Sequence, residues 1–293
     1  MMQAISPEIT ELIYSASAHD LNGGDGLFLL LDGARLPEMP RWLASNVTEE
    51  NWVSLLGATA GSPLLAASPV LVSLTPDISH RPFVRRLFKL FEHRRAASVI
   101  VSSIELKALA QHLGDRMYVL DPDRTKWALA IWDPYVLAAL VGLRPALSAL
   151  VPGPILFTEQ IAGLLEPISR WYFIGPEGMP CSMAASSGAP DTVSTEPLLL
   201  TQKQMNQLAD IPLPDLVLKT LNRVCPEITN RNSAVSLHAT ACAAIVESRR
   251  NGRDDLASYC EVAYEKFMEI NVARTIDPTV QSQRSGDIDV RTP

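Results

Sequence analysis

Short apolar runs alternate with helical patterns along the first half of the chain. Leu27–Leu31, Val70–Leu74 and Ser98–Val101 are continuous runs of mostly apolar residues, which is typical of strands that are buried on both faces. Helical periodicity is found at His80–Arg95 and Ile104–His112. Because strands alternate with helices, the pattern predicts an α/β lobe built around a sheet.

A predicted hairpin adds antiparallel pairing to this lobe. Apolar segments at Met117–Leu120 and Trp127–Trp132 flank residues 121–124, which are Asp, Pro, Asp and Arg and favour a turn. Thr48 is expected to cap a further helix that runs to Leu56. The predicted fold class is therefore α/β, with a mixed-direction sheet and flanking helices in the N-terminal lobe.

The second half of the chain has a different pattern. Residues 178–197 are rich in Ser, Gly, Pro, Ala and Thr, which favours a loop or linker. Helical periodicity follows, most clearly at Val235–Arg250 and Asp254–Ile270. We therefore predict four parts, which are an α/β lobe at 1–177, the linker at 178–197, an all-helical lobe at 198–270 and a flexible tail at 271–293.

Composition and charge narrow the class of protein. The chain of 293 residues is 47% hydrophobic and 19% charged, which excludes a wholly disordered protein. Its net charge of -7 gives no overall basic footprint for nucleic acid, and no apolar run reaches the roughly 18 residues of a membrane-spanning helix. The first ten residues lack the basic and apolar segments of a secretory signal. We therefore expect a cytoplasmic protein that neither binds nucleic acid nor spans a membrane.

The residue types that bind metals show no suitable spacing. The four cysteines, at 181, 225, 242 and 260, are far apart and form no CxxC pair. The five histidines include no His-Glu-x-x-His arrangement. No metal, cofactor or disulfide is expected, and the thiols are expected to be buried in a reducing compartment.

One motif could carry enzymatic chemistry. Asp121, Asp123 and Thr125 follow an apolar segment, in a D-x-D-x-T pattern that resembles the first motif of haloacid dehalogenase-type phosphatases. In those enzymes the first Asp is the nucleophile and the second a general acid beside Mg²⁺. However, no later strand ends in paired acids, and Pro and Asp are common turn residues. We expect no enzyme and no catalytic residue, and a phosphatase that uses Asp121 and Asp123 is the alternative.

The predicted helix at residues 80–95 is basic, although the whole chain is acidic. It carries six Lys or Arg residues against one Glu. Its Arg85, Arg86 and Lys89 are candidate contacts for an acidic partner or an anionic surface. The other interpretation is a solvated outer face on a helix that packs against the sheet.

Several stretches of the first lobe match, in order, the motifs of one family. The first is Leu29–Arg35, with the sequence LLLDGAR, and the most distinctive is Trp132–Leu137, with WDPYVL. The others are Leu55–Thr59, Ser68–Val72, Ser98–Ser102, Leu109–Leu113, Trp127–Leu129, Gly153–Ile155 and Trp171. Together they resemble the type VI secretion system effector adaptors, the Tap/Tec chaperones, whose domain was long classified as one of unknown function.

The resemblance implies a function without catalysis. Proteins of this family are bacterial and cytoplasmic, and each binds a cognate toxic effector. They help load the effector onto the secretion spike, a trimeric valine-glycine repeat protein that often carries a PAAR tip. A secreted effector and a spike protein are therefore the expected partners. Tyr135 stands where the family signature has Arg, so contacts made by that Arg are not carried over.

The motif residues are expected to have structural roles. They are Asp32, Gly33, Trp132, Asp133, Pro134 and Tyr135. Asp133 in particular can cap a helix that begins at Pro134, because Asp is a favoured N-cap residue and Pro is favoured at the first helical position.

The last predicted helix is the candidate for partner binding. It has more apolar residues than a helix packed on one neighbour needs. Aromatic and Met side chains are enriched in the cores of protein interfaces. The residues expected to contact a partner are Tyr259, Tyr264, Phe267 and Met268.

Overall fold

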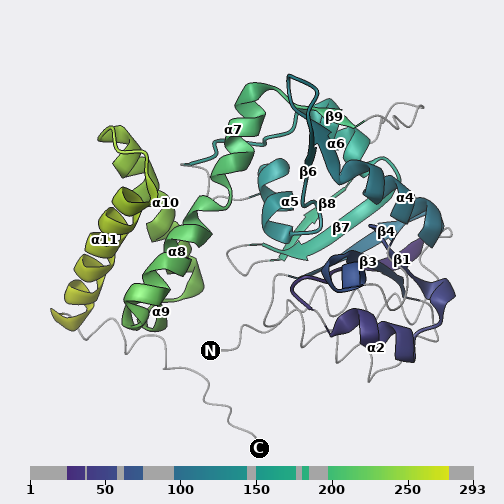
Figure 1. The fold of residues 1–293 in the computed structure, drawn as a ribbon, viewed down its shortest axis with the longest axis horizontal. Helices are drawn as coiled ribbons and strands as arrows, with labels where there is room; N and C mark the ends of the chain where they lie inside the picture. Colours follow the sequence, from purple (N-terminus) through teal and green to yellow (C-terminus); the bar gives the residue numbers. More distant parts are fainter. Residues whose placement is uncertain are drawn as a thin grey trace, which may run out of the picture. The chain divides into compact units, whose positions relative to one another are not determined.

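The structure is a computed structural model, and it describes residues 25–36, 38–57, 63–74, 96–143, 150–175, 180–184 and 197–276. The chain divides into two compact units, Met1–Ile211 and Pro212–Pro293. Figure 1 labels most of the helices and strands of both units. The division falls after helix α7 (Gln202–Asp210), whereas the sequence pattern places the start of the helical lobe before it, at residue 198.

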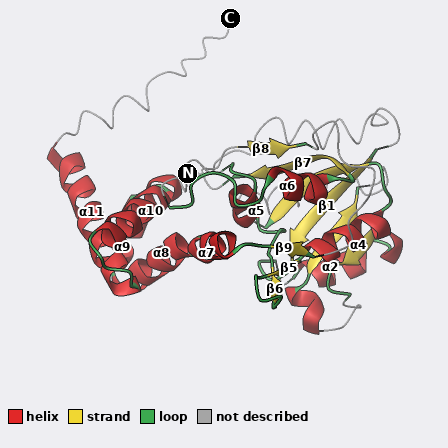
Figure 2. Ribbon diagram, turned by 90° about the horizontal axis from the view of Figure 1, so that it is seen from above, coloured by secondary structure: helices red, strands yellow, loops and turns green. Residues whose placement is uncertain are grey.

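A six-stranded sheet forms the centre of the first unit. From edge to edge its strands are β2 (Trp52–Ser54), β3 (Pro69–Ser73), β1 (Gly26–Asp32), β4 (Ala97–Ser102), β7 (Ile168–Ile174) and β8 (Pro180–Met183). Every neighbouring pair is antiparallel. The three strands predicted from apolar runs, β3, β1 and β4, are adjacent and have other strands on both sides. Figure 2 shows the strands in yellow, with β1, β7 and β8 of this sheet labelled.

The central strands are apolar on both faces, and this buries the sheet. Leu29 of β1 lies opposite Val72 of β3 and Val99 of β4, and all three side chains belong to the hydrophobic core. The same core contains Met39 and Leu43 of helix α2 (Met39–Asn46). Because side chains alternate along a strand, the neighbouring residues point to the other face of the sheet.

That other face contains the largest fully buried side chain, Trp171 of β7. Trp171 lies opposite Ile100 of β4. Its indole N–H donates a hydrogen bond to Ser98 Oγ at 2.8 Å. The buried donor is therefore satisfied within the sheet, as burial of a polar group requires.

Further helices and a second sheet belong to the described part of the first unit. The helices are α4 (Leu106–Arg116), α5 (Pro134–Leu140), α6 (Thr158–Leu165) and α7, with the short 3-10 helices η1 (Glu49–Asn51) and η2 (Pro63–Ala67). The second sheet has the order β6 (Lys126–Ala128), β5 (Tyr118–Leu120), β9 (Leu198–Leu199). Strand β5 is antiparallel to β6 and parallel to β9. Both strand directions occur, and the predicted α/β class with flanking helices and a helical C-terminal region is confirmed.

The second unit is helical throughout its described residues. It contains α8 (Leu213–Val224), α9 (Pro226–Arg231), α10 (Ala234–Arg250) and α11 (Leu256–Ile276). Its core includes Val217 and Leu221 of α8, Ile245 of α10 and Phe267 of α11, all of which are buried. Helix α10 begins with Ser233, whose side chain accepts a hydrogen bond from the backbone N–H of Ser236. Among the described residues of the whole chain, no helix is long and apolar enough to cross a membrane.

The helix predicted from Thr48 to Leu56 is wrong. Only one 3-10 turn forms, in η1, and Trp52–Ser54 is strand β2. Trp52 lies opposite Val72 of β3 and is only 6% exposed. Sheet pairing and burial of the indole therefore override the helix-start signal of Thr48, since local propensity is a weak preference.

The predicted linker at 178–197 also contains regular structure. Residues 180–183 form β8, which pairs with β7 and places Met183 opposite Trp171. Helix α9 was not predicted, and α11 extends to Ile276, beyond the expected end at residue 270. The basic helix predicted at 80–95, with Arg85, Arg86 and Lys89, lies outside the described residues.

Candidate functional site

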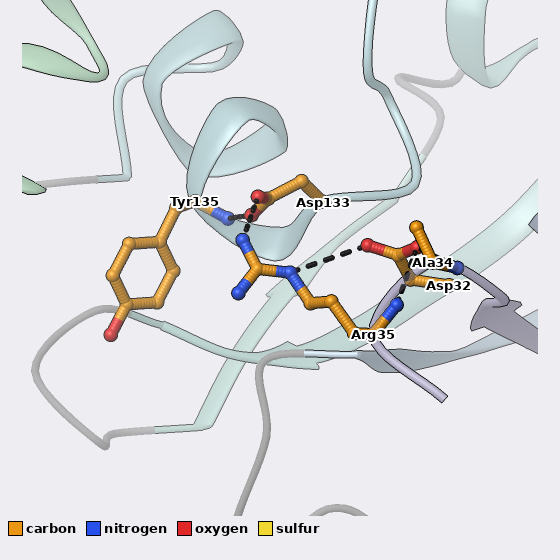
Figure 3. A network of polar contacts seen from close by, with 5 residues as sticks. All are labelled: Asp32, Ala34, Arg35, Asp133 and Tyr135. Carbon is orange, nitrogen blue, oxygen red and sulfur yellow. Dashed lines mark hydrogen bonds and ion pairs between the residues drawn. The ribbon is translucent and has the colours of Figure 1, made fainter. Parts of the chain in front are cut away.

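The carboxyl end of β1 carries a buried acid that organises the turn after the strand. Asp32 is 5% exposed. Its Oδ1 accepts hydrogen bonds from the backbone N–H groups of Ala34 at 3.0 Å and Arg35 at 3.4 Å (Figure 3). Burial raises the pKa of Asp32 above its ordinary value, and the bonds from Arg35 and Ala34 offset this effect only in part.

Arg35 links this turn to a second acid far along the chain. Its Nε lies 3.3 Å from Asp32 Oδ2, and its Nη2 lies 3.0 Å from Asp133 Oδ2 (Figure 3). The side chain of Arg35 is 43% exposed, whereas those of Asp32 and Asp133 are 7% and 17% exposed. The guanidinium therefore covers two largely buried carboxylates from the solvent side. We call Asp32, Arg35 and Asp133 the acid–arginine clamp.

Asp133 also begins helix α5. Its Oδ1 accepts a hydrogen bond from the backbone N–H of Tyr135 at 2.8 Å, and Pro134 occupies the first helical position. The predicted cap is confirmed. One carboxylate therefore caps α5 through Oδ1 and binds Arg35 through Oδ2. The residues on either side of Asp133 and Pro134 differ in burial, since Tyr135 is buried and Trp132 is partly buried.

Gly33 allows two backbone segments to approach closely beside the clamp. Its N–H donates to the carbonyl of Ser68 at 3.2 Å. A Cβ atom added to Gly33 would lie 2.2 Å from that carbonyl oxygen, which no side chain could tolerate without a shift of the backbone. Ser68 continues the contact inward, because its Oγ lies 2.6 Å from Ser54 Oγ of β2. Gly33 is therefore required by the packing of the chain.

The clamp is an arrangement that holds elements together. Both oxygens of Asp32 are engaged, and both oxygens of Asp133 are engaged. The Asp32 carboxylate faces the guanidinium of Arg35. This guanidinium keeps its proton at all relevant pH values, so Arg35 cannot serve as a general base. What the arrangement does chemically is to fix the end of β1 to the start of α5.

The D-x-D-x-T motif forms a hairpin turn between β5 and β6. Asp121 accepts hydrogen bonds from the backbone N–H of Thr125 at 2.8 Å and from the indole N–H of Trp127 at 2.9 Å. The bond from Trp127 is the main reason that the pKa of Asp121 is lowered. Arg124 has a φ of 62°, in the left-handed region that tight turns use. The predicted turn is confirmed, and Asp123 is exposed on it.

The described residues contain no group of three or more His, Cys, Asp or Glu side chains placed to bind a metal ion. Asp121 and Asp123 lie in the hairpin, and the paired acids at 254 and 255 precede α11 in the other unit. In that unit the pKa of Asp254 is lowered, chiefly by a hydrogen bond from the Tyr259 hydroxyl. This acid therefore serves the local structure before α11.

The four candidate contacts on α11 separate into two pairs. Tyr259 and Phe267 are 3% and 0% exposed, so they belong to the core of the helical unit and are not available to a partner. For these two residues the expectation is corrected. Tyr264 and Met268 are 40% and 41% exposed and lie four residues apart, on one face of the helix. They remain candidates for a partner contact.

The sequence pattern places Arg35 within the LLLDGAR stretch but assigns it no role. A signal for that role was present, because an acid at the end of a buried strand is followed three residues later by Arg. This spacing allows the Asp32–Arg35 pair. The second partner, Asp133, is 98 positions away and could be found only from the structure.

Comparison with known proteins adds one finding about the first unit. No curated protein and no solved structure matches the chain. A family model matches the segment that begins in β1 and contains all three residues of the clamp. Residues 27–146 are similar to the family described as a domain of unknown function, DUF4123.

Proposed function

We propose that the protein is a non-catalytic adaptor that binds a cognate type VI secretion effector and helps load it onto the secretion spike. The observation that carries the proposal is the clamp. It joins the LLLDGAR and WDPYVL stretches, which are two of the stretches that resemble the effector adaptors. The match of residues 27–146 to DUF4123 covers both stretches. Motifs that meet in space are less easily explained by chance than motifs that match only in order.

The geometry is also suited to a binding protein. The acids at the end of β1 and the start of α5 hold a rigid scaffold together, and the D-x-D-x-T acids stabilise a turn. An adaptor must hold its effector in the cytoplasm and release it at the spike. Such an interface needs apolar anchors surrounded by a polar rim. Tyr264 and Met268, with the neighbouring Glu265 and Glu269, offer this combination on the exposed side of α11.

The test uses the native bacterial host and the genes next to this one. The tagged protein is purified from the host, and the co-purified proteins are identified by mass spectrometry. We expect a toxin encoded nearby and a spike protein, and we expect loss of that toxin from the secreted fraction when the gene is deleted. An effector from another secretion cluster of the same host serves as the control. If secretion of every effector is unchanged by the deletion, the protein is not an adaptor.

A further inference from the structure

An open groove lies along helix α8 in the helical unit. Its volume is about 610 Å³, and its described lining residues are Leu216, Lys219, Thr220, Asn222 and Arg223. Helical spacing places Leu216, Lys219 and Arg223 on one side of α8. Val217 and Leu221 lie on another side and are buried in the core. The side formed by Leu216, Lys219 and Arg223 is therefore separate from the buried side formed by Val217 and Leu221.

Two cations on the groove face form no ion pair within the described part of the chain. Lys219 and Arg223 are exposed, and neither forms an ion pair with a described residue. In the same unit, Arg249, Arg253 and Lys266 each pair with a carboxylate. Lys219 and Arg223 are four residues apart, a spacing at which like charges repel. A bound anion would relieve this repulsion.

The groove also presents an apolar side chain between polar ones. Leu216 is 43% exposed, one turn before Thr220 and Lys219. Water-exposed Leu beside unpaired cations fits a ligand that has both carboxylates and an apolar group. Single-stranded nucleic acid fits less well, because stacking of bases needs aromatic side chains and none is among the described lining residues.

We infer that the α8 groove binds an acidic segment of a partner protein, with carboxylates on Lys219 and Arg223 and one branched apolar side chain against Leu216. Binding of such a segment does not depend on the adaptor function. All the described residues that line the groove belong to the helical unit.

Arg223 has a second possible role that the test must separate from binding. It lies in the last turn of α8, where a cation stabilises the negative end of the helix dipole. Arg250 occupies the same place in α10 and is also exposed. Arg250→Gln is therefore the matched control, since it removes a cation from a helix end in the same unit but lies outside the groove lining.

The probe is a fluorescein-labelled peptide of about twelve residues, with four Glu around two Leu in a Ser/Gly background. Its binding to the full chain is followed by fluorescence anisotropy. We expect the unmodified chain and Arg250→Gln to bind alike. Lys219→Gln combined with Arg223→Gln should weaken binding about ten-fold or more, because charge-assisted hydrogen bonds are lost. Leu216→Ser should also weaken it, and a peptide with Gln in place of Glu should bind poorly. Urea unfolding midpoints verify that each variant is folded.

Three results would overturn the inference. The first is no binding of the acidic peptide to the unmodified chain. The second is that the double variant and Leu216→Ser both bind the peptide as tightly as the unmodified chain does. The third is a rise of about ten-fold or more in affinity when the chain ends at Ile276, because the tail at 277–293 would then be the occupant of the groove in place of a partner.

Discussion

Arg35 Nη2 lies 3.0 Å from Asp133 Oδ2, although the two residues are 98 positions apart. The same guanidinium lies 3.3 Å from Asp32 through its Nε. One side chain therefore connects the turn after the central strand β1 to the N-terminus of α5. Two stretches that are separate motifs in the sequence are therefore joined in the fold.

Replacing Arg35 should destabilise the first unit through the acid that it leaves behind. In Arg35→Ala the buried Asp32 loses its only described cation, so we expect the free energy of unfolding to fall by about 1–2 kcal/mol. Urea denaturation measures the change. Arg41→Ala, which removes an exposed Arg from α2, is the matched control and should change stability by less than about 0.5 kcal/mol. Equal effects of the two substitutions would show that the clamp contributes nothing.

Two Gly→Ala substitutions should act in opposite directions. In Gly33→Ala the new Cβ would lie 2.2 Å from the Ser68 carbonyl oxygen, so we expect a loss of about 3 kcal/mol or more, or failure to fold. Gly163 lies within α6, and a Cβ there meets nothing within 4 Å. Gly163→Ala should be stabilising by roughly 0.5–1 kcal/mol, because Ala favours helix. Thermal unfolding of both variants checks the prediction, and a tolerated Gly33→Ala would contradict it.

The sequence predicts those elements whose signal is local. Leu27–Leu31 identifies β1 because a strand buried on both faces needs a continuous apolar run. Asp133 and Pro134 identify the start of α5 because both residues act within one helical turn. The hairpin at Asp121 is found for the same reason, since turn chemistry depends on four adjacent residues.

The features that the sequence misses depend on distant partners. Strand β2 exists because Trp52 pairs with Val72 and is buried, and β8 exists because Met183 pairs with Trp171. Neither segment has a run long enough to predict a strand alone. The Arg35–Asp133 bond likewise requires the completed fold. On α11, periodicity predicts a helix but does not reveal which apolar residues face the core.

Asp32 and Asp121 should titrate in opposite directions from the ordinary Asp pKa of about 3.8. Burial raises the pKa of Asp32, whereas the Trp127 hydrogen bond lowers that of Asp121. The folded chain thus binds a proton at Asp32 more readily than the unfolded chain does. Ionised Asp32 lowers the stability of the fold, and this loss of stability decreases as pH falls through the folded pKa of Asp32. Asp121 contributes stability above pH 3.8, which is lost as pH falls through its lower folded pKa.

Carboxyl ¹³C NMR titration measures both values directly. Unfolding experiments between pH 7 and pH 3 provide the independent check. On acidification, the stability of the unmodified chain should rise relative to Asp32→Asn and fall relative to Asp121→Asn. If the stability of the unmodified chain changes in the same direction relative to both variants, burial is not the dominant effect at Asp32 or hydrogen bonding is not the dominant effect at Asp121.

The hairpin geometry predicts that Asp121 has no role as a nucleophile. Its two oxygens accept bonds from Thr125 and Trp127, so the carboxylate is held in the turn. We expect no Mg²⁺-dependent hydrolysis of p-nitrophenyl phosphate above background, and no difference between the unmodified chain and Asp121→Asn. Hydrolysis that requires Mg²⁺ and disappears in Asp121→Asn, while Asp115→Asn remains active, would instead support the phosphatase alternative.

Exposure on α11 separates residues that can meet a partner from residues that hold the helical unit together. Tyr264 and Met268 are exposed, so Tyr264→Ala and Met268→Ala should change the free energy of unfolding by less than about 0.5 kcal/mol. Phe267 is fully buried, and Phe267→Ala should cost about 3–5 kcal/mol. Truncation after Arg250 would remove all of α11, which supplies the buried Tyr259 and Phe267 to the core. The truncated chain would lose core packing as well as the exposed face, so it could not test that face alone.

The binding experiment therefore uses point variants, in co-expression with the effector encoded nearby. If α11 contacts the effector, Tyr264→Ala with Met268→Ala should reduce the amount of effector that co-purifies by about ten-fold, since aromatic and Met side chains often dominate interface energies. Ala257→Ser, at an exposed position on the same helix, should leave it unchanged. Full retention of the effector by the folded double variant would exclude this face of α11 as its binding site, because both exposed apolar side chains would then be dispensable.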